Sequence, residues 1–112
     1  MKLEDFLLEI FSVKKKYELT LLYLDYTDNT LICRLGLNSE IFIQIYVNVR
    51  KKKLNLALII KDFRIYGVDK EGGFYHEHPV ENPTSHLPID DRISIEDFIL
   101  KSIEILKDLG YL

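Results

Sequence analysis

Apolar side chains alternate strictly with a mixed set of side chains along residues 40–50. Successive side chains of a β-strand point to opposite faces, so this period of two predicts a strand with one aliphatic face. The aliphatic positions are Ile41, Ile43, Ile45, Val47 and Val49, and between them lie Phe42, Gln44, Tyr46 and Asn48. The pattern is typical of a sheet that is covered on one face.

Similar strand patterns, separated by turn residues, lie on both sides of this segment. Asp, Asn, Ser and Thr favour turns because their short side chains hydrogen-bond to the nearby backbone. The expected elements, in chain order, are strand 18–26, turn 27–30, strand 31–37, turn 38–39, strand 40–50, turn 50–53 and a strand from Leu54 onward. The first two strands should form a hairpin that leads into the central strand.

In the strand from Leu54, apolar positions are even-numbered up to Ile60 and odd-numbered at Phe63 and Ile65. One inserted residue exchanges the two faces of a strand, which predicts a β-bulge near Lys61 and Asp62. The elements expected beyond it are a turn at 71–73, a short fifth strand at 74–78 and an ordered proline-rich loop at 79–88.

Apolar residues recur at helical spacing near both ends of the chain. Residues 3–13 form the first such pattern, with acids near its start and Lys14–Lys16 at its end, as the helix dipole favours. The second pattern begins with Ser94 and Asp97, a variant of the capping box, and ends near Gly110. The apolar stripes consist of Leu3, Phe6, Leu7, Ile10 and Phe11 in the first helix and Ile95, Phe98, Ile99, Ile103 and Leu106 in the second.

These elements predict one α+β domain over residues 1–112. Short connections favour an antiparallel meander sheet of four to five strands, with the N-terminal and C-terminal helices packed on one face. A chain of 112 residues has room for one hydrophobic core. Aromatic side chains should crowd the other face, which would suit a dimer surface or a binding groove; they are Tyr23, Phe42, Tyr46 and Tyr66.

Composition narrows the classes of protein. Hydrophobic residues make up 47% and charged residues 29%, as in globular chains. No apolar run reaches the roughly 20 residues that cross a membrane, and acids interrupt the N-terminal apolar pattern, unlike a signal peptide. A cytoplasmic location without a membrane partner is therefore expected. Cys33 is the single cysteine, which excludes an internal disulfide and a Cys-based zinc site and predicts a small buried residue.

The net charge of −3 is unevenly distributed. Residues 1–68 hold 11 Lys and Arg against 8 Asp and Glu, whereas residues 69–112 hold 4 against 10. This charge distribution does not indicate a nucleic-acid-binding surface over the whole chain. A local basic patch in the first half remains as a possible phosphate site. The richness in Ile, Leu, Lys and Glu resembles the usage of thermophilic proteins.

All three histidines, His76, His78 and His86, lie within eleven residues. In a strand over 74–78 the first two would project from one side. Three interpretations stay open: exposed or structurally hydrogen-bonded histidines, a general acid and base or an RNA contact, or a divalent metal site at His76 and His78. A metal would need His86 or a carboxylate as a further ligand, with Asp69, Glu77 and Glu81 as candidates.

The basic turn at 50–53 is a second candidate site. Its Lys52 and Lys53 could contact phosphates, with Tyr46 or Tyr66 as a stacking surface, although such a turn can also simply protect a sheet edge. The candidate substrate-binding residues are Asp69, Tyr66, Lys52 and Lys53. The sequence contains no Gly-rich phosphate loop and no nucleophile elbow, which excludes kinases, dehydrogenases and serine hydrolases of the common types.

Tyr66 and Asp69 are followed by His76-Glu77-His78-Pro79, by Pro83-Thr84-Ser85-His86 and then by a helix. This order, over about residues 64–106, resembles the C-terminal half of the TumE-like toxin family of prokaryotic toxin–antitoxin pairs. Where that family usually has Asn and a denser run of histidines, this chain has Lys70 and Ser85. The resemblance implies a toxin that acts on RNA through His76, His78 and His86 and is neutralised by an antitoxin protein encoded nearby.

Two functions from different classes follow. The first is a small cytoplasmic toxin-like protein that binds or cleaves RNA at the histidine cluster, with His76, His78 and His86 as catalytic candidates. The alternative is a non-catalytic, homodimeric protein-interaction module whose second sheet face meets a partner, because apolar residues lie on both strand faces and no complete catalytic set is evident. The sequence leaves open whether the protein is an enzyme.

Overall fold

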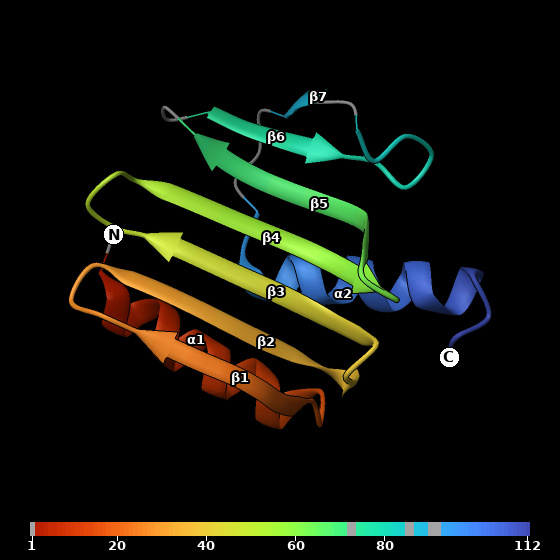
Figure 1. Cartoon of the computed structure of the whole chain (residues 1–112), viewed down its shortest axis with the longest axis horizontal. Coiled ribbons are helices and arrows are strands. Elements are labelled where there is room, and N and C mark those ends of the chain that lie inside the picture. The colour runs from red at the N-terminus through yellow and green to blue at the C-terminus, as the bar shows by residue number, and fades with distance from the viewer. Residues whose placement is uncertain (1, 72–73, 85–86, 90–92) are drawn as a thin grey trace.

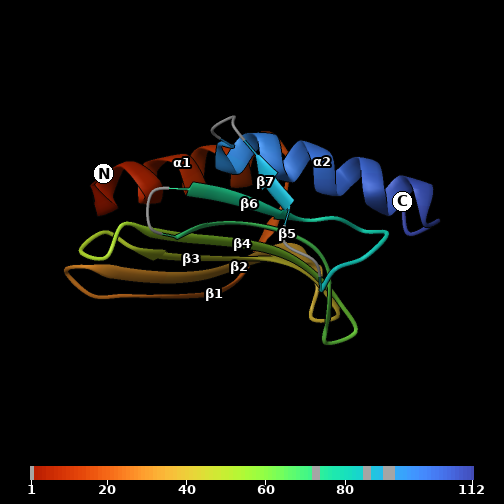
Figure 2. The same cartoon turned by 90° about the horizontal axis from the view of Figure 1, so that it is seen from above.

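Seven antiparallel strands form one sheet in chain order, and two helices lie against one of its faces (Figure 1, Figure 2). The computed structural model describes residues 2–71, 74–84, 87–89 and 93–112. The elements are α1 (Leu3–Lys16), β1 (Thr20–Tyr26), β2 (Thr30–Asn38), β3 (Ile41–Asn48), β4 (Lys53–Ile60), β5 (Phe63–Glu71), β6 (Phe74–His78), β7 (Leu87–Ile89) and α2 (Ile95–Asp108). The α+β class and the antiparallel meander are confirmed, with more strands than the four to five predicted.

A tight turn at Lys61 and Asp62 separates β4 from β5. Both residues have positive φ angles, 49° and 71°, and Ile60 pairs with Phe63 across the turn. Two successive positive φ angles are typical of the two-residue hairpin turns that match strand twist. The bulge predicted near these residues is therefore wrong, because the change in apolar parity comes from the hairpin. A bulge does occur farther along β5, at Ile65.

The proline-rich segment also contains a strand that the sequence did not predict. β7 pairs with β6 and places Pro88 opposite His76, within the segment 79–88 that was expected to be a loop. Proline lacks a backbone N–H and so is tolerated on an edge strand, where one side needs no ladder bond. Helix α1 likewise extends to Lys16, beyond the predicted end at residue 13.

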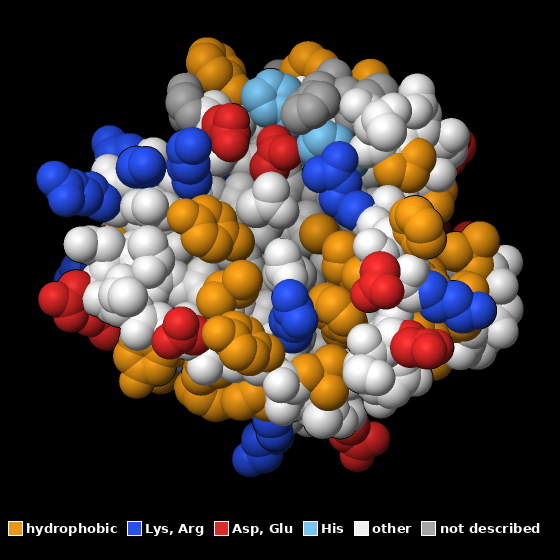
Figure 3. Space-filling view, viewed as in Figure 1, with side chains coloured by type: hydrophobic (Ala, Val, Ile, Leu, Met, Phe, Trp, Pro, Cys, Tyr) orange, Lys and Arg blue, Asp and Glu red, His pale blue; other side chains and the backbone are white. Residues whose placement is uncertain are grey.

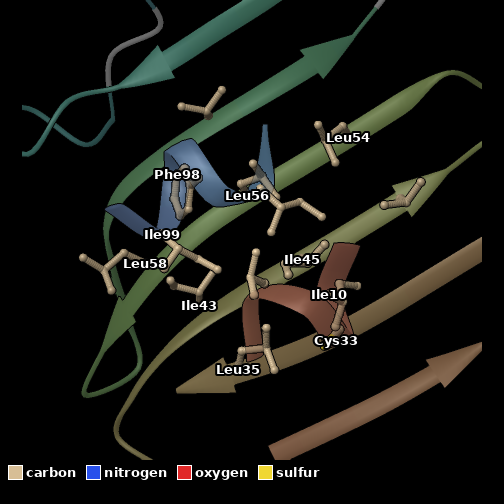
Figure 4. Close-up of a cluster of buried hydrophobic side chains, with 14 of the residues drawn as sticks. Ile10, Cys33, Leu35, Ile43, Ile45, Leu54, Leu56, Leu58, Phe98 and Ile99 are labelled. Carbon is tan, nitrogen blue, oxygen red and sulfur yellow. The ribbon is translucent and has the colours of Figure 1, made fainter. Parts of the chain in front are cut away.

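The core lies between the sheet and the two helices (Figure 4). Alternate aliphatic residues of β2 to β5 are buried against Ile10 of α1 and Phe98 and Ile99 of α2. Burying one such side chain stabilises the fold by roughly 1.5–3 kcal/mol. Cys33 is fully buried in this cluster, as predicted, and burial raises the pKa of its thiol to about 11.

Tyr66 belongs to the same core. Its ring stacks on Phe98 with centroids 5.3 Å apart, and its side chain is buried. The prediction that Tyr66 lies on the other sheet face is wrong, because the extra residue Ile65 turns Tyr66 and Val68 toward the helices. Tyr23, Phe42 and Tyr46 are not among the residues packed in this core.

Side chains from α1 and from the start of α2 itself hydrogen-bond to the first backbone N–H groups of α2. Ser94 accepts a hydrogen bond from the Asp97 backbone N–H, and the Asp97 carboxylate accepts one in return, so the predicted capping box is confirmed. Glu9 of α1 adds a partner, since its Oε1 accepts from the backbone N–H groups of Ile95 at 2.9 Å and Glu96 at 3.4 Å. A carboxylate suits the positive end of a helix.

Candidate functional site

The helices leave one face of the sheet uncovered, and Figure 3 shows this face. Residues from successive strands line up there in two rows across the sheet. The first row is Asp25, Ile32, Tyr46, Asn55, Asp69, His76 and Pro88, and the second row is Tyr23, Arg34, Gln44, Ala57, Gly67 and His78. Both described histidines therefore belong to these rows on β6, side by side on one face, as their two-residue spacing predicts.

The carboxylate of Asp69 lies between the two imidazoles. Its Oδ2 is 2.7 Å from Nε2 of His78, and its Oδ1 is 3.5 Å from Nδ1 of His76. The side chain of His76 is 31% exposed, whereas those of Asp69 and His78 are 13% and 2% exposed. We call these three residues the Asp–His cluster. Only its outer member, His76, is open enough to meet a substrate directly.

The second ring nitrogen of His78 faces the segment that follows β6. Nδ1 lies 3.2 Å from the carbonyl oxygen of Pro83 and 3.3 Å from Nη2 of Arg64, and Arg64 Nη2 also donates to that carbonyl at 3.0 Å. With Nε2–H donated to Asp69, a neutral ring accepts from Arg64 at Nδ1, and a charged ring donates to Pro83. The network can thus satisfy either protonation state of His78.

A glycine makes room for this arrangement. A Cβ atom at Gly67 would lie 3.2 Å from the Leu56 carbonyl oxygen, 3.3 Å from Cδ of Arg64 and 3.5 Å from Cδ2 of His78. The missing side chain lets the arginine and the imidazole lie close together over β5.

The other candidate residues lie elsewhere or outside the described part of the chain. His86 lies outside the described residues. Tyr66 is on the helix-covered face, where its hydroxyl donates to Oε2 of Glu77 at 3.0 Å; burial, and then the Glu77 charge, raises the pKa of Tyr66. Lys52 lies in the β3–β4 turn with a φ of 53°, and Lys53 lies 3.8 Å from a carboxylate oxygen of Glu71. The structure therefore brings together Asp69, His76 and His78.

Metal binding finds no support among the described residues. They contain no group of three or more His, Cys, Asp and Glu side chains that could hold a metal ion. In addition, the guanidinium of Arg64 contacts Nδ1 of His78, and Nε2 of His78 is hydrogen-bonded to Asp69. A cation at that position opposes the binding of a second one.

No protein-family model, curated protein or solved structure matches the chain. The resemblance of residues 64–106 to TumE-like toxins therefore stays a prediction. Neither described helix is long and apolar enough to cross a membrane.

The Asp–His cluster combines three features that suit proton transfer. Asp69 can orient the His76 imidazole through Nδ1. The pair lies on an uncovered face, where a substrate can reach it. Arg64, an exposed guanidinium on β5 that contacts His78, could bind an anionic group near the cluster. This set of groups suits the hydrolysis or transfer of a phosphate ester.

Proposed function

We propose that the protein binds RNA on the uncovered sheet face and cleaves it at the Asp–His cluster. The observation that carries this proposal is the single carboxylate of Asp69 placed between two imidazoles, one buried and one partly exposed. A histidine oriented by a carboxylate is an effective proton acceptor near neutral pH. The toxin-like resemblance of residues 64–106 implies the same substrate.

The proposed reaction begins at Nε2 of His76, which accepts the proton of a ribose 2′-hydroxyl. The 2′-oxygen attacks the adjacent phosphorus, the bond to the 5′-oxygen breaks, and that oxygen takes a proton from water. His76 then returns its proton to the hydroxide that remains, so the products are a 2′,3′-cyclic phosphate and a 5′-hydroxyl end. Arg64 offsets the charge that develops on the phosphate oxygens.

The three cluster residues have different roles in this proposal. His76 touches the substrate, whereas Asp69 and His78 are positioning residues. His78 Nε2 lies 2.7 Å from Oδ2 of Asp69, and His78 is too deeply buried to touch RNA. Loss of His76 should therefore abolish the reaction without unfolding the protein, and loss of His78 should also weaken the fold.

The test is cleavage of an end-labelled single-stranded RNA by wild type and His76→Ala. Proton transfer of this kind contributes roughly a hundredfold to ten-thousandfold in rate, so we expect a loss of at least about a hundredfold. Lys15→Ala, an exposed change on α1, is the matched control. An all-deoxy strand should resist cleavage, because it lacks the attacking hydroxyl. Unchanged RNA cleavage and growth inhibition by His76→Ala would refute the proposal.

A second candidate is a homodimeric interaction module that uses the same face. It is favoured by apolar side chains without cover, since Tyr23 is 46% exposed and Ile32 and Tyr46 lie on the same face. A partner, such as a second copy or an antitoxin protein, would bury them. Light scattering that shows a monomer over a wide concentration range would exclude the homodimer.

A further inference from the structure

Arg34 is held in a fixed position on β2, on the uncovered face of the sheet. Its guanidinium carbon lies 5.7 Å from the ring centroid of Tyr23 and 5.2 Å from that of Phe42. Its Nε donates a hydrogen bond to Oε1 of Gln44 at 3.1 Å. Three side chains from the two neighbouring strands therefore fix an arginine that remains exposed to solvent. An arginine that merely solubilises a surface needs no such support.

The charge of Arg34 is not neutralised within the described residues. None of their carboxylates lies within ion-pair distance of it, and only its Nε hydrogen-bonds to one of their side chains. By contrast, Lys16, Lys53 and Lys101 each have a carboxylate partner. The terminal guanidinium nitrogens of Arg34 are thus available to a phosphate, which binds well to their fork geometry.

Arg34 and the Asp–His cluster lie on the same face of the sheet. Arg34 on β2 and His78 on β6 share the second row, four strand intervals apart, which corresponds to about 19 Å at the usual strand spacing. Between them the row contains Gln44, Ala57 and Gly67, and Ala57 is only 4% exposed although no helix covers it. A strand that contacts both sites must cross these residues. In Figure 3 a basic side chain lies among apolar ones near the middle of the face, with histidines, acids and further basic groups toward its upper edge.

We propose that Arg34, with Tyr23, is a second contact site for single-stranded RNA. Arg34 binds a backbone phosphate, and an unpaired base stacks on the Tyr23 ring or on the guanidinium plane. A single strand is required because paired bases do not offer their faces to a side chain. This inference rests on the proposed function, since the strand that crosses Arg34 is the one that reaches His76.

The test measures binding separately from cleavage. A fluorescein-labelled uridine oligomer of about 12 nucleotides is titrated by fluorescence anisotropy in the His76→Ala background, where it stays intact. Arg34→Ala in that background should weaken binding about tenfold. The slope of log Kd against log salt should also fall by about 0.7, the value for one lost phosphate contact on a single strand. Lys15→Ala removes the same charge from α1 and should change neither quantity.

Two further variants separate charge from stacking. Arg34→Lys keeps the positive charge but not the planar group, so it should keep the salt slope and still lose affinity. Tyr23→Ala should lose affinity with an unchanged slope, and an RNA duplex of the same length should bind more weakly than the single strand. Unchanged urea midpoints establish that each variant is folded.

The outcomes distinguish this inference from the proposed function. If Arg34→Ala weakens binding while His76→Ala still cleaves, the RNA contact stands and the cleavage proposal fails. If His76→Ala abolishes cleavage but Arg34→Ala binds like Lys15→Ala, the second contact site is refuted. Absence of binding by the wild-type face, or a loss of self-association in Arg34→Ala in place of a loss of RNA binding, also overturns the inference.

Discussion

The hydrogen bond between Asp69 and His78 should contribute measurably to stability, and a double-mutant cycle can isolate it. The perturbations are Asp69→Ala, His78→Ala and the double variant. The bond is short, at 2.7 Å, and both side chains are largely withdrawn from solvent, at 13% and 2% exposed. A hydrogen bond to a charged group in such a setting contributes roughly 1.5–3 kcal/mol.

Each single substitution should cost more than the bond itself. Asp69→Ala leaves the buried Nε2–H of His78 without its partner, and His78→Ala also removes a buried ring. We expect about 3 kcal/mol for each, from the desolvation of an unpaired group and from the cavity. The double variant should be about 2 kcal/mol more stable than the sum of the two single losses predicts. Each single variant loses the same hydrogen bond, and the double variant loses it only once.

The assay is urea denaturation of the four proteins at neutral pH. The slope of the free energy of unfolding against urea concentration is given the same value for all four. Lys53 and Glu71 provide a matched control pair, since they are 3.8 Å apart and 42% and 64% exposed. Exposed pairs of this kind couple by less than about 1 kcal/mol. If the Asp69 and His78 effects add to within about 0.5 kcal/mol, the interpretation of the cluster as a tightly held unit is refuted.

Two other predictions concern the core and the helix pair. Glu9→Ala should cost about 1–2 kcal/mol in urea denaturation, because the Ile95 and Glu96 N–H groups lose their acceptor, while Glu4→Ala in the exposed first turn should cost little; equal effects would contradict this. Burial in the folded protein raises the pKa of the Cys33 thiol from 9.0 to about 11, so the unfolded protein loses this proton at a lower pH than the folded protein does. The free energy of unfolding should therefore fall by about 3 kcal/mol as the pH rises from 9 to 11. The urea midpoint of Cys33→Ala should fall correspondingly less than that of the wild type between pH 9 and 11. Parallel curves of midpoint against pH for the two proteins would rule out this thiol as the cause of the pH dependence.

The strands were predictable wherever one face is buried. A shift of strand register by one residue there would expose all the apolar side chains of that face, so the sequence pattern is strict. The alternation in 40–50 located β3 and its face for this reason. The β4–β5 turn was missed because Lys61 and Asp62 take positive φ angles that usually call for Gly or Asn. The sequence pattern there fits a bulge equally well, and only the pairing of Ile60 with Phe63 decides between them.

The candidate site was only partly predictable. The spacing of His76 and His78 placed both on one face, and Asp69 appeared among the candidate metal ligands and substrate contacts. Its position between the imidazoles depends on the register of β5 against β6, which no local signal reveals. The contributions of Arg64 and the Pro83 carbonyl depend in addition on the bulge at Ile65 and on the path of the chain after β6.

The contact of Glu9 with the start of α2 has a consequence for synthesis of the chain on the ribosome. Every strand pairs with its sequence neighbour, so the sheet can grow as each hairpin emerges. The partner of Glu9, however, lies 86 residues later in the chain, and half of the helical cover comes with α2. Until α2 leaves the ribosome, the aliphatic face of β3 to β5 lacks Phe98 and Ile99 and is open to other chains. The nascent protein should therefore depend on chaperones most strongly just before its last helix is made.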